Sequence, residues 1–358
     1  MKLLSLLHRW TGGFVGLLLA VIGLSGIALL WEDSWILLDG AGDAPISGPA
    51  DLGKTVEVAL EIAPALSRIT FAGDDFGLHQ AVYSDGSGAY IAQDGTVVER
   101  WSGMWERPEL WLFDLHHYLL LGETGKTITG ILGILLLAFT ITGLILWWRT
   151  RKTFRFRLWP PRYTASAIIR HHRDLGVVAS PLLLLAAATG TLIVFPAISS
   201  FLLAPVAEDR AKPDLPSDLA PVAETTDWAR VMANAQAAYP EAAARRLMMP
   251  AAPGEPIAIR FRQSFEWTPN GRSYVWIAPD TATVVAKDGP AGRDMASAIT
   301  EKYYPIHAAK VGGLLWRIVM TFAGFALVVL GSLATWSFWR ARVGARSAKV
   351  VHPRRATS

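Results

Sequence analysis

The residues of this sequence with the clearest potential for chemistry are four histidines near the ends of long apolar segments. Two of them, His8 and His172, are each followed by arginine, by glycine at the same offset, and then by an apolar segment. The other two, His116 and His307, each precede an apolar segment that closes with Trp-Arg at the same spacing. The pattern indicates a repeated unit of two membrane helices. Histidines paired at matched membrane depth are the axial ligands that a haem iron requires.

Composition and hydropathy predict a membrane protein. About half of the residues are hydrophobic, and charged residues are few for the length. A bilayer span takes about 20 apolar residues. Four stretches meet this length without Asp, Glu, Lys or Arg: Thr11–Trp31, Thr127–Trp148, Leu175–Pro196 and Ile318–Trp339. The first lacks the small-residue cleavage site of a signal peptide, so we expect it to be a retained helix.

These spans divide the chain into membrane and extramembrane segments. We expect transmembrane helices over residues 1–31, 111–149, 171–198 and 305–340. We expect a basic loop over 150–170 and a tail over 341–358. The two longer segments, 32–110 and 199–304, each predict a small α+β module of one helix and several short strands. The expected fold is therefore an all-α membrane core of two parallel two-helix repeats, carrying two α+β modules.

The distribution of basic residues predicts the orientation. Lys and Arg gather before the first span, between the second and third, and after the fourth. By the positive-inside rule, both termini and the basic loop face the cytoplasm, and the two long segments face outward, into the periplasm of a bacterium. The basic residues lie where anionic lipid attracts them, so no nucleic-acid partner is expected.

The absence of cysteine limits the possible cofactors. Without cysteine there is no disulfide, no iron–sulfur cluster and no covalent haem attachment. A haem in this protein would be a non-covalent haem b held by histidine.

Helix direction predicts how the histidines pair. The first and third helices run in the same direction, as do the second and fourth, so a pseudo-two-fold axis along the membrane normal relates the halves. This axis pairs His8 with His172 near the cytoplasm and His116 with His307 near the periplasm, giving two haems per chain. A register slip of one residue would bring in the adjacent histidines, His117 and His171.

Glycines share a helix face with two of these histidines. His8 and Gly26 are separated by five whole turns, as are His172 and Gly190, and Gly12 lies close to the same stripe. A strip without side chains gives a flat macrocycle room to lie against the helix. Close helix packing is the alternative, and it is favoured for the stripe taken alone.

Basic residues at matched offsets are candidates to neutralise haem propionates. One pair directly follows the cytoplasmic histidines, and the other lies ten residues after the periplasmic ones: Arg9, Arg173, Lys126 and Arg317. Snorkelling of basic side chains to the lipid headgroups is an equal alternative. Another histidine, His79, is expected at the surface of the first module.

Motifs in the sequence resemble the PepSY-associated transmembrane helix family. These motifs are Leu7-His8-Arg9-Trp10-Thr11-Gly12, Leu115-His116-His117, Gly143-Leu144-Ile145-Leu146-Trp147-Trp148-Arg149 and Arg170-His171-His172-Arg173. The outward modules look like PepSY domains, most closely at Tyr274–Thr281. The resemblance covers nearly the whole chain and is strongest in the first two helices. The fourth departs from it, because Ala334 stands where the second has Gly143.

The resemblance implies a bacterial inner-membrane protein of iron uptake, similar to di-haem reductases that release iron from ferric siderophores in the periplasm. No dinucleotide-binding motif is present, so electrons would come from a quinol or a reductase partner. The main rival is a non-redox PepSY membrane protein that binds a peptide, a protease or a siderophore-handling partner. A metal transporter is disfavoured because the spans lack charge.

The topology is testable with reporter fusions. Fusions after Gly40 and near Asp218 should report an outside location, and fusions near Arg155 and after Arg346 an inside one, because basic segments stay in the cytoplasm. Opposite orientation of the two halves would contradict the parallel repeat and the histidine pairing that follows from it.

Overall fold

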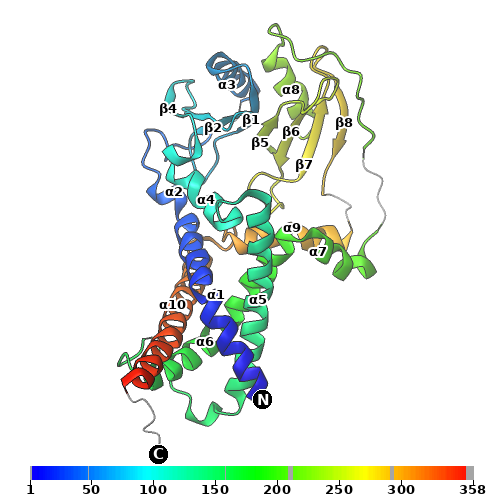
Figure 1. The fold of residues 1–358 in the computed structure, drawn as a ribbon. Coiled ribbons are helices and arrows are strands. Elements are labelled where there is room, and N and C mark those ends of the chain that lie inside the picture. The colour runs from blue at the N-terminus through cyan, green and yellow to red at the C-terminus, as the bar shows by residue number, and fades with distance from the viewer. Residues whose placement is uncertain (1, 47, 158, 209–212, 291–293, 352–358) are drawn as a thin grey trace, which may run out of the picture. The chain divides into compact units, whose positions relative to one another are not determined.

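The chain folds into two compact units, each assembled from segments that are distant in the sequence (Figure 1). The structure is a computed structural model that describes residues 2–46, 48–157, 159–208, 213–290 and 294–351. The helical unit comprises Met1–Leu30, Leu112–Pro196 and Ile306–Ser358. The sheet unit comprises Trp31–Trp111 and Ala197–Pro305.

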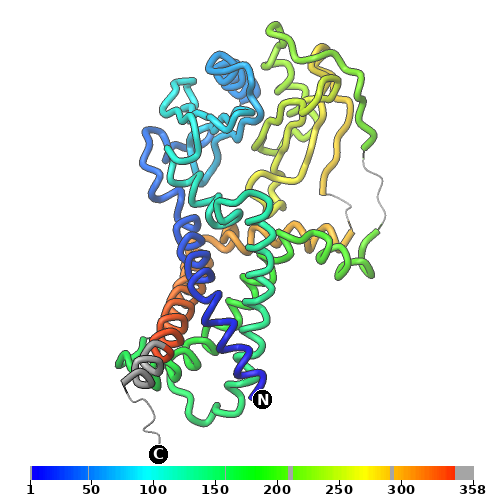
Figure 2. The backbone as a smooth tube through the Cα atoms, viewed as in Figure 1, coloured from blue at the N-terminus to red at the C-terminus, as the bar shows by residue number. Residues whose placement is uncertain are grey.

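Four long helices form the helical unit: α1 (Lys2–Leu30), α5 (Gly122–Trp148), α6 (Ala165–Val194) and α10 (Gly313–Val351). All four are long and apolar enough to cross a membrane, so the protein is a multi-pass membrane protein. Figure 2 shows that α1 and α6 run in one direction and that α5 and α10 run in the other. Leucine and alanine side chains from all four helices pack between them.

Helix α1 lies close against α10 through glycines. A Cβ atom on Gly16 would lie 3.0 Å from the carbonyl oxygen of Gly331, and one on Gly23 would lie 3.0 Å from that of Gly324. Such small-residue contacts let the two backbones approach closely. Close helix packing is therefore one role of Gly16 and Gly23 on α1.

Two of the expected spans are interrupted. His116 lies on a separate helix, α4 (Pro108–Tyr118), and His307 ends another, α9 (Met295–His307). Backbone at positive φ separates these helices from α5 and α10, at Leu119, Leu120 and Gly122 and at Ala309, Gly312 and Gly313. A right-handed helix cannot continue through such residues. The expected continuous helices over 111–149 and 305–340 are corrected accordingly, and α10 continues beyond the expected end at residue 340.

The sheet unit contains eight antiparallel strands and two covering helices. The first half provides α3 (Pro49–Ile62), β1 (Leu66–Thr70), β2 (His79–Tyr83), β3 (Gly88–Ile91) and β4 (Val97–Trp101). The second half provides α8 (Trp228–Ala238), β5 (Ala243–Met248), β6 (Ile257–Arg262), β7 (Ser273–Ile277) and β8 (Val284–Asp288). Short helices complete the chain: α2 (Glu32–Trp35) and α7 (Pro196–Leu203), with 3-10 turns at Met104–Glu106, Arg151–Thr153 and Ala204–Val206.

The two halves share a single sheet, whereas the sequence predicts two modules. The strand order is β4-β3-β2-β1-β5-β6-β7-β8, and β1 pairs with β5 so that Ile69 lies opposite Leu247. Helices α3 and α8 contact each other closely, because a Cβ atom on Gly53 would lie 2.7 Å from the backbone nitrogen of Ala229. Both helices and the facing strand residues belong to one hydrophobic core.

His79 is buried in this unit, which corrects its expected surface position. Its side chain is 2 % exposed, and its Nδ1 accepts a hydrogen bond of 3.0 Å from the backbone N–H of Ala72. Burial, with a smaller contribution from the charge of Arg245, lowers the pKa of His79 to about 4. His79 is therefore neutral in the folded protein at pH 7.

This burial predicts acid sensitivity of the sheet unit. The unfolded chain binds more protons at His79 between pH 6.5 and 4, so the free energy of unfolding falls as the pH drops through this window. The loss at pH 5 relative to pH 7 should be about 2 kcal/mol. His79→Asn retains an acceptor for Ala72 and should remove this loss. Urea unfolding of the detergent-solubilised protein, followed by tryptophan fluorescence, measures it, and equal pH dependence in both proteins would refute it.

Candidate functional site

The four histidines form two pairs in the helical unit. The ring centroids of His8 on α1 and His172 on α6 are 6.2 Å apart, with the ring planes at 86°. Those of His116 on α4 and His307 on α9 are also 6.2 Å apart, at 51°. The pairing therefore matches the one expected from helix direction.

The adjacent histidines lie elsewhere. The ring of His117 stacks on Phe113, with centroids 5.4 Å apart and planes at 7°. His171 is fully buried but is not among the residues that line the cavity beside His172. The register of both pairs thus follows His116 and His172.

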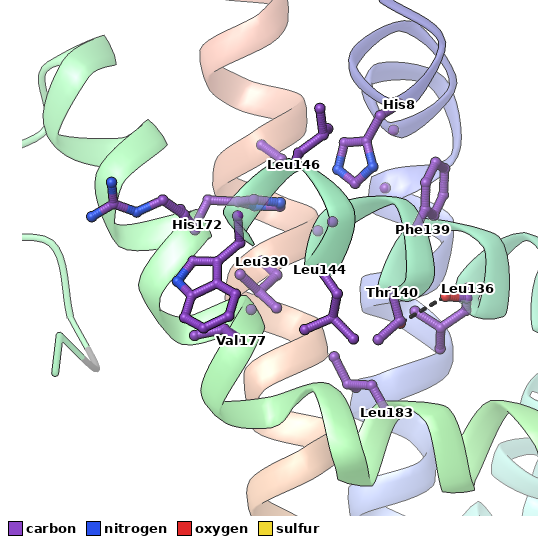
Figure 3. Close-up of a pocket in the computed structure, with 18 of the residues that line it drawn as sticks. His8, Leu136, Phe139, Thr140, Leu144, Leu146, His172, Val177, Leu183 and Leu330 are labelled. Carbon is purple, nitrogen blue, oxygen red and sulfur yellow. Dashed lines mark hydrogen bonds between the residues drawn. The ribbon is translucent and has the colours of Figure 1, made fainter. Parts of the chain in front are cut away.

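The first pair opens onto a cavity of about 440 Å³ between the four long helices. Figure 3 shows His8 and His172 at this cavity, with Phe139 and Leu144 from α5 and Leu330 from α10. The lining is mostly apolar. Two of its glycines, Gly12 and Gly176, face open space, since a Cβ atom on either would have no neighbour within 4 Å.

Polar atoms at the cavity are incompletely bonded. The Nδ1 atom of His8 lies 2.9 Å from the hydroxyl of Thr142, which itself donates to the carbonyl of Ala138. The hydroxyl proton is thereby used, so His8 Nδ1 is the donor. Among the described residues, Nε1 of Trp147 has no hydrogen-bond partner, although this atom is buried. Buried polar atoms without partners mark a place where a ligand or water can bind.

The second pair is held by backbone carbonyls. His116 Nδ1 lies 3.0 Å from the carbonyl oxygen of Ile22 and 3.1 Å from the hydroxyl of Ser25. A carbonyl can only accept, so Nδ1 carries the proton and Nε2 presents a lone pair.

His307 makes the same contacts in the other half of the unit. Its Nδ1 lies 3.1 Å from the carbonyl oxygen of Ala186 and 3.1 Å from the hydroxyl of Thr189. The same tautomer follows, because the carbonyl again requires a donor. Both rings of the second pair therefore present an unprotonated Nε2.

Gly26 and Gly190 make room for these rings. A Cβ atom on Gly26 would lie 2.9 Å from Cε1 of His116, and one on Gly190 would lie 2.9 Å from Cε1 of His307. The glycines expected to lie beneath His8 and His172 thus have two different roles. Gly12 faces the cavity of the first pair, whereas Gly26 and Gly190 seat the imidazoles of the second.

The two pairs lie near opposite ends of the helices. Along α1, His8 and the contact point at Gly26 are separated by roughly 27 Å at 1.5 Å per residue. This length is close to the hydrocarbon thickness of a bilayer. Both sites therefore belong to one membrane-spanning unit.

The four candidate cations differ in their surroundings. Arg9 is exposed and outside the cavity lining, and Lys126 forms an ion pair of 3.1 Å with exposed Glu123. Arg173 lines the cavity but is held by Asp174, with Nε 2.8 Å from the carboxylate, and by the hydroxyl of Thr153. The half-buried Arg317 lies near the start of α10.

Three further residues of this region, Asp174, Trp147 and Thr142, were not predicted from the sequence. Asp174 is fully buried and also forms an ion pair with Arg157, and Trp147 lies at the end of a span, where tryptophans commonly contact the lipid headgroups. The repeat offers a signal for Thr142. The offset that separates His116 from His307 also separates Thr142 from Leu333, so only the first copy of the repeat carries a hydroxyl at this position. Because leucine has no hydroxyl, His172 lacks the partner that His8 has.

Asp174 should contribute more to stability than an exposed carboxylate. Asp174→Asn leaves two guanidinium groups beside a neutral amide and should cost about 2–4 kcal/mol. The matched change Glu123→Gln removes an exposed ion pair and should cost less than about 0.5 kcal/mol. Unfolding in micelles of increasing SDS fraction measures both. Equal losses would show that the Asp174 network is not a structural anchor.

A comparison with known protein families gives a match, which covers both units of the structure. The family model described as PepSY-associated TM region matches residues 5–342. The match includes α5 and α6, most of α1 and α10, both histidine pairs and the sheet unit. No curated protein matches the sequence.

Proposed function

The chain belongs to the family of PepSY-associated TM regions, and from this premise and the geometry of the two histidine pairs we propose that it is a di-haem electron carrier. His8 and His172 would hold one haem b, and His116 and His307 the other. Electrons would pass across a bacterial inner membrane to a periplasmic ferric siderophore or similar chelate, whose iron is reduced and released. A quinol or a reductase partner would supply the electrons on the cytoplasmic side.

The separation of the rings supports this proposal most directly. A metal–imidazole bond of about 2.0 Å, with roughly 1.1 Å from nitrogen to ring centre, puts the centres of two axial imidazoles about 6 Å apart. Both pairs have centroids 6.2 Å apart. Two symmetric pairs at this separation suit axial ligation of two irons.

The hydrogen bonds of the rings also suit metal ligation. Metal-binding histidines typically donate their other ring N–H to a carbonyl or similar acceptor, which fixes the tautomer and the orientation of the ring. His116 and His307 do so to Ile22 and Ala186, and His8 does so to Thr142. In each case Nε2 is left as the ligand atom.

The cavity at the first pair suits a flat apolar group with polar edges. Gly12 and Gly176 leave room along two helices, and apolar side chains exclude water. The unpartnered Nε1–H of Trp147 is a donor that suits a propionate carboxylate. Haem b, when bound, supplies reversible one-electron chemistry, and filling both axial positions favours electron transfer over oxygen binding.

The placement of the two sites suits transfer across a membrane. They are separated along α1 by about the thickness of the hydrocarbon layer. By the charge of the loops, the end that carries His8 faces the cytoplasm and the end that carries His116 faces the periplasm. The chelate would then meet the second pair.

The decisive test is the reduced-minus-oxidised absorption spectrum of the purified protein. We expect low-spin b-type haem at two per chain, extractable by acid acetone. His8→Ala and His172→Ala should remove the same haem, and His116→Ala and His307→Ala the other, because one imidazole rarely retains a bis-ligated iron. His117→Ala is the matched control and should retain both.

Two outcomes would contradict the proposal. Folded protein from haem-replete cells without a haem band would favour a non-redox role, in which the sheet unit binds a partner. Loss of one common haem in His8→Ala and His307→Ala would show that the pairing is wrong.

A further inference from the structure

A row of polar side chains crosses the sheet on the face opposite α3 and α8. The helices pack on residues such as Ile69, Leu247 and Ile259, and side chains alternate between faces along each strand. The strand register places six residues of the other face in line: Tyr90, Gln80, Thr70, Arg246, Arg260 and Tyr274. The row centres on the β1–β5 junction, where the two halves meet (Figure 1).

The part of this row on β1, β5 and β6 concentrates positive charge, whereas Tyr90 at its end donates a hydrogen bond of 3.0 Å to the carboxylate of Glu109. Arg246 and Arg260 are directly opposite, and Arg68 is the diagonal neighbour of Arg246. Like charges placed opposite each other across strands are destabilising. Within the described part of the chain, neither Arg246 nor Arg68 forms an ion pair. The nearby carboxylate of Glu266 accepts from the backbone N–H groups of the β6–β7 connection and the hydroxyl of Ser273.

Three donors in this row lack partners. The Nε atoms of Arg246 and Arg260 and the hydroxyl of Thr70 are buried and have no hydrogen-bond partner among the described residues. Burial, and then the charges of Arg260 and Arg68, lower the pKa of Arg246 to about 10. Arg246 therefore remains charged at pH 7. A half-buried cation next to two others favours the binding of an anion, which the described residues do not provide.

We propose that this row is a binding site for a small ligand with carboxylate groups. The planar guanidinium groups of Arg246 and Arg260 match carboxylates in shape and charge, and the Thr70 hydroxyl adds a donor. Tyr274 and Trp276 stack on each other at 5.4 Å and border the site with an aromatic surface. Arg260 lies over the Tyr274 ring at 5.2 Å, which orients its guanidinium.

This site would also define the class of chelate. The identity of the ligand as an iron chelate rests on the proposed electron transfer. With that function, the ligand would be an iron chelate of the carboxylate type. The anion site itself depends on the sheet alone. Loss of haem binding would thus disprove the electron carrier and leave the anion site standing.

The test is calorimetric titration of the full-length protein in detergent with citrate, and separately with ferric citrate. Both should bind, because both present carboxylates, and the neutral triamide of the same skeleton should not. Arg246→Gln should weaken citrate binding at least tenfold. Arg230 is an exposed residue of α8, on the opposite face of the sheet. Arg230→Gln is therefore the matched control and should change the citrate affinity less than twofold.

A second measurement separates binding from folding. Arg246→Gln removes repulsion with Arg260 and Arg68, so it should raise the unfolding temperature of the ligand-free protein, and its haem spectrum should be unchanged. Citrate affinity unchanged in Arg246→Gln would overturn the inference. A lower unfolding temperature in that variant would also overturn it, because it would show that Arg246 serves the fold.

Discussion

An imidazole ring can pack against the backbone of a helix only where that helix carries no side chain, and this constraint governs the helical unit. Gly26 and Gly190 supply that gap, since any Cβ atom there would press on a histidine ring. The carbonyls that receive the rings belong to Ile22 and Ala186, one turn earlier on the same helices. Removing the side chain at one position thus exposes the carbonyl four residues before it. Each of these two glycines therefore helps to set both the position and the tautomer of the histidine that packs against it.

The breaks in the helices follow from the same constraint. A histidine within a continuous span would point as its helix dictates, whereas His116 and His307 lie at or near the ends of short helices. The chain then turns through residues at positive φ before the next long helix begins. Glycine occupies several of these positions, because it adopts positive φ without steric cost. Leu119, Leu120 and Ala309 do so at some strain, which the surrounding contacts must offset.

The sequence predicted the features that depend on the periodicity of apolar residues and on the repeat. It did not predict the features that depend on tertiary contacts. Span positions and the pairing of His8 with His172 followed from apolar length and repeat offset. The joining of the two modules into one sheet could not be predicted from the sequence, because the sequences of β1 and β5 do not show whether each is an edge strand or a central strand. His79 was misplaced for a related reason: only the sheet reveals that Ala72 and Phe71 enclose it. Trp147 fits the aromatic belt by position, and only the cavity shows its unpartnered nitrogen.

The departures from the repeat have a physical meaning of their own. Thr142 gives His8 a hydroxyl acceptor for its Nδ1–H, whereas Leu333, the corresponding residue, has no hydroxyl, and the His172 ring interacts with the backbone of Leu330 instead. Gly143 leaves space at His8, where a Cβ atom would lie 3.6 Å from Cε1, whereas Ala334 fills the matching position. Acceptors for the second ring nitrogen raise the basicity of a ligating imidazole. The two rings of the first pair therefore have different partners, a hydroxyl for His8 and a backbone group for His172, whereas each ring of the second pair has a carbonyl and a hydroxyl. In the proposed electron carrier, such a difference between two sites built from one repeated unit would give electron transfer between the haems a direction.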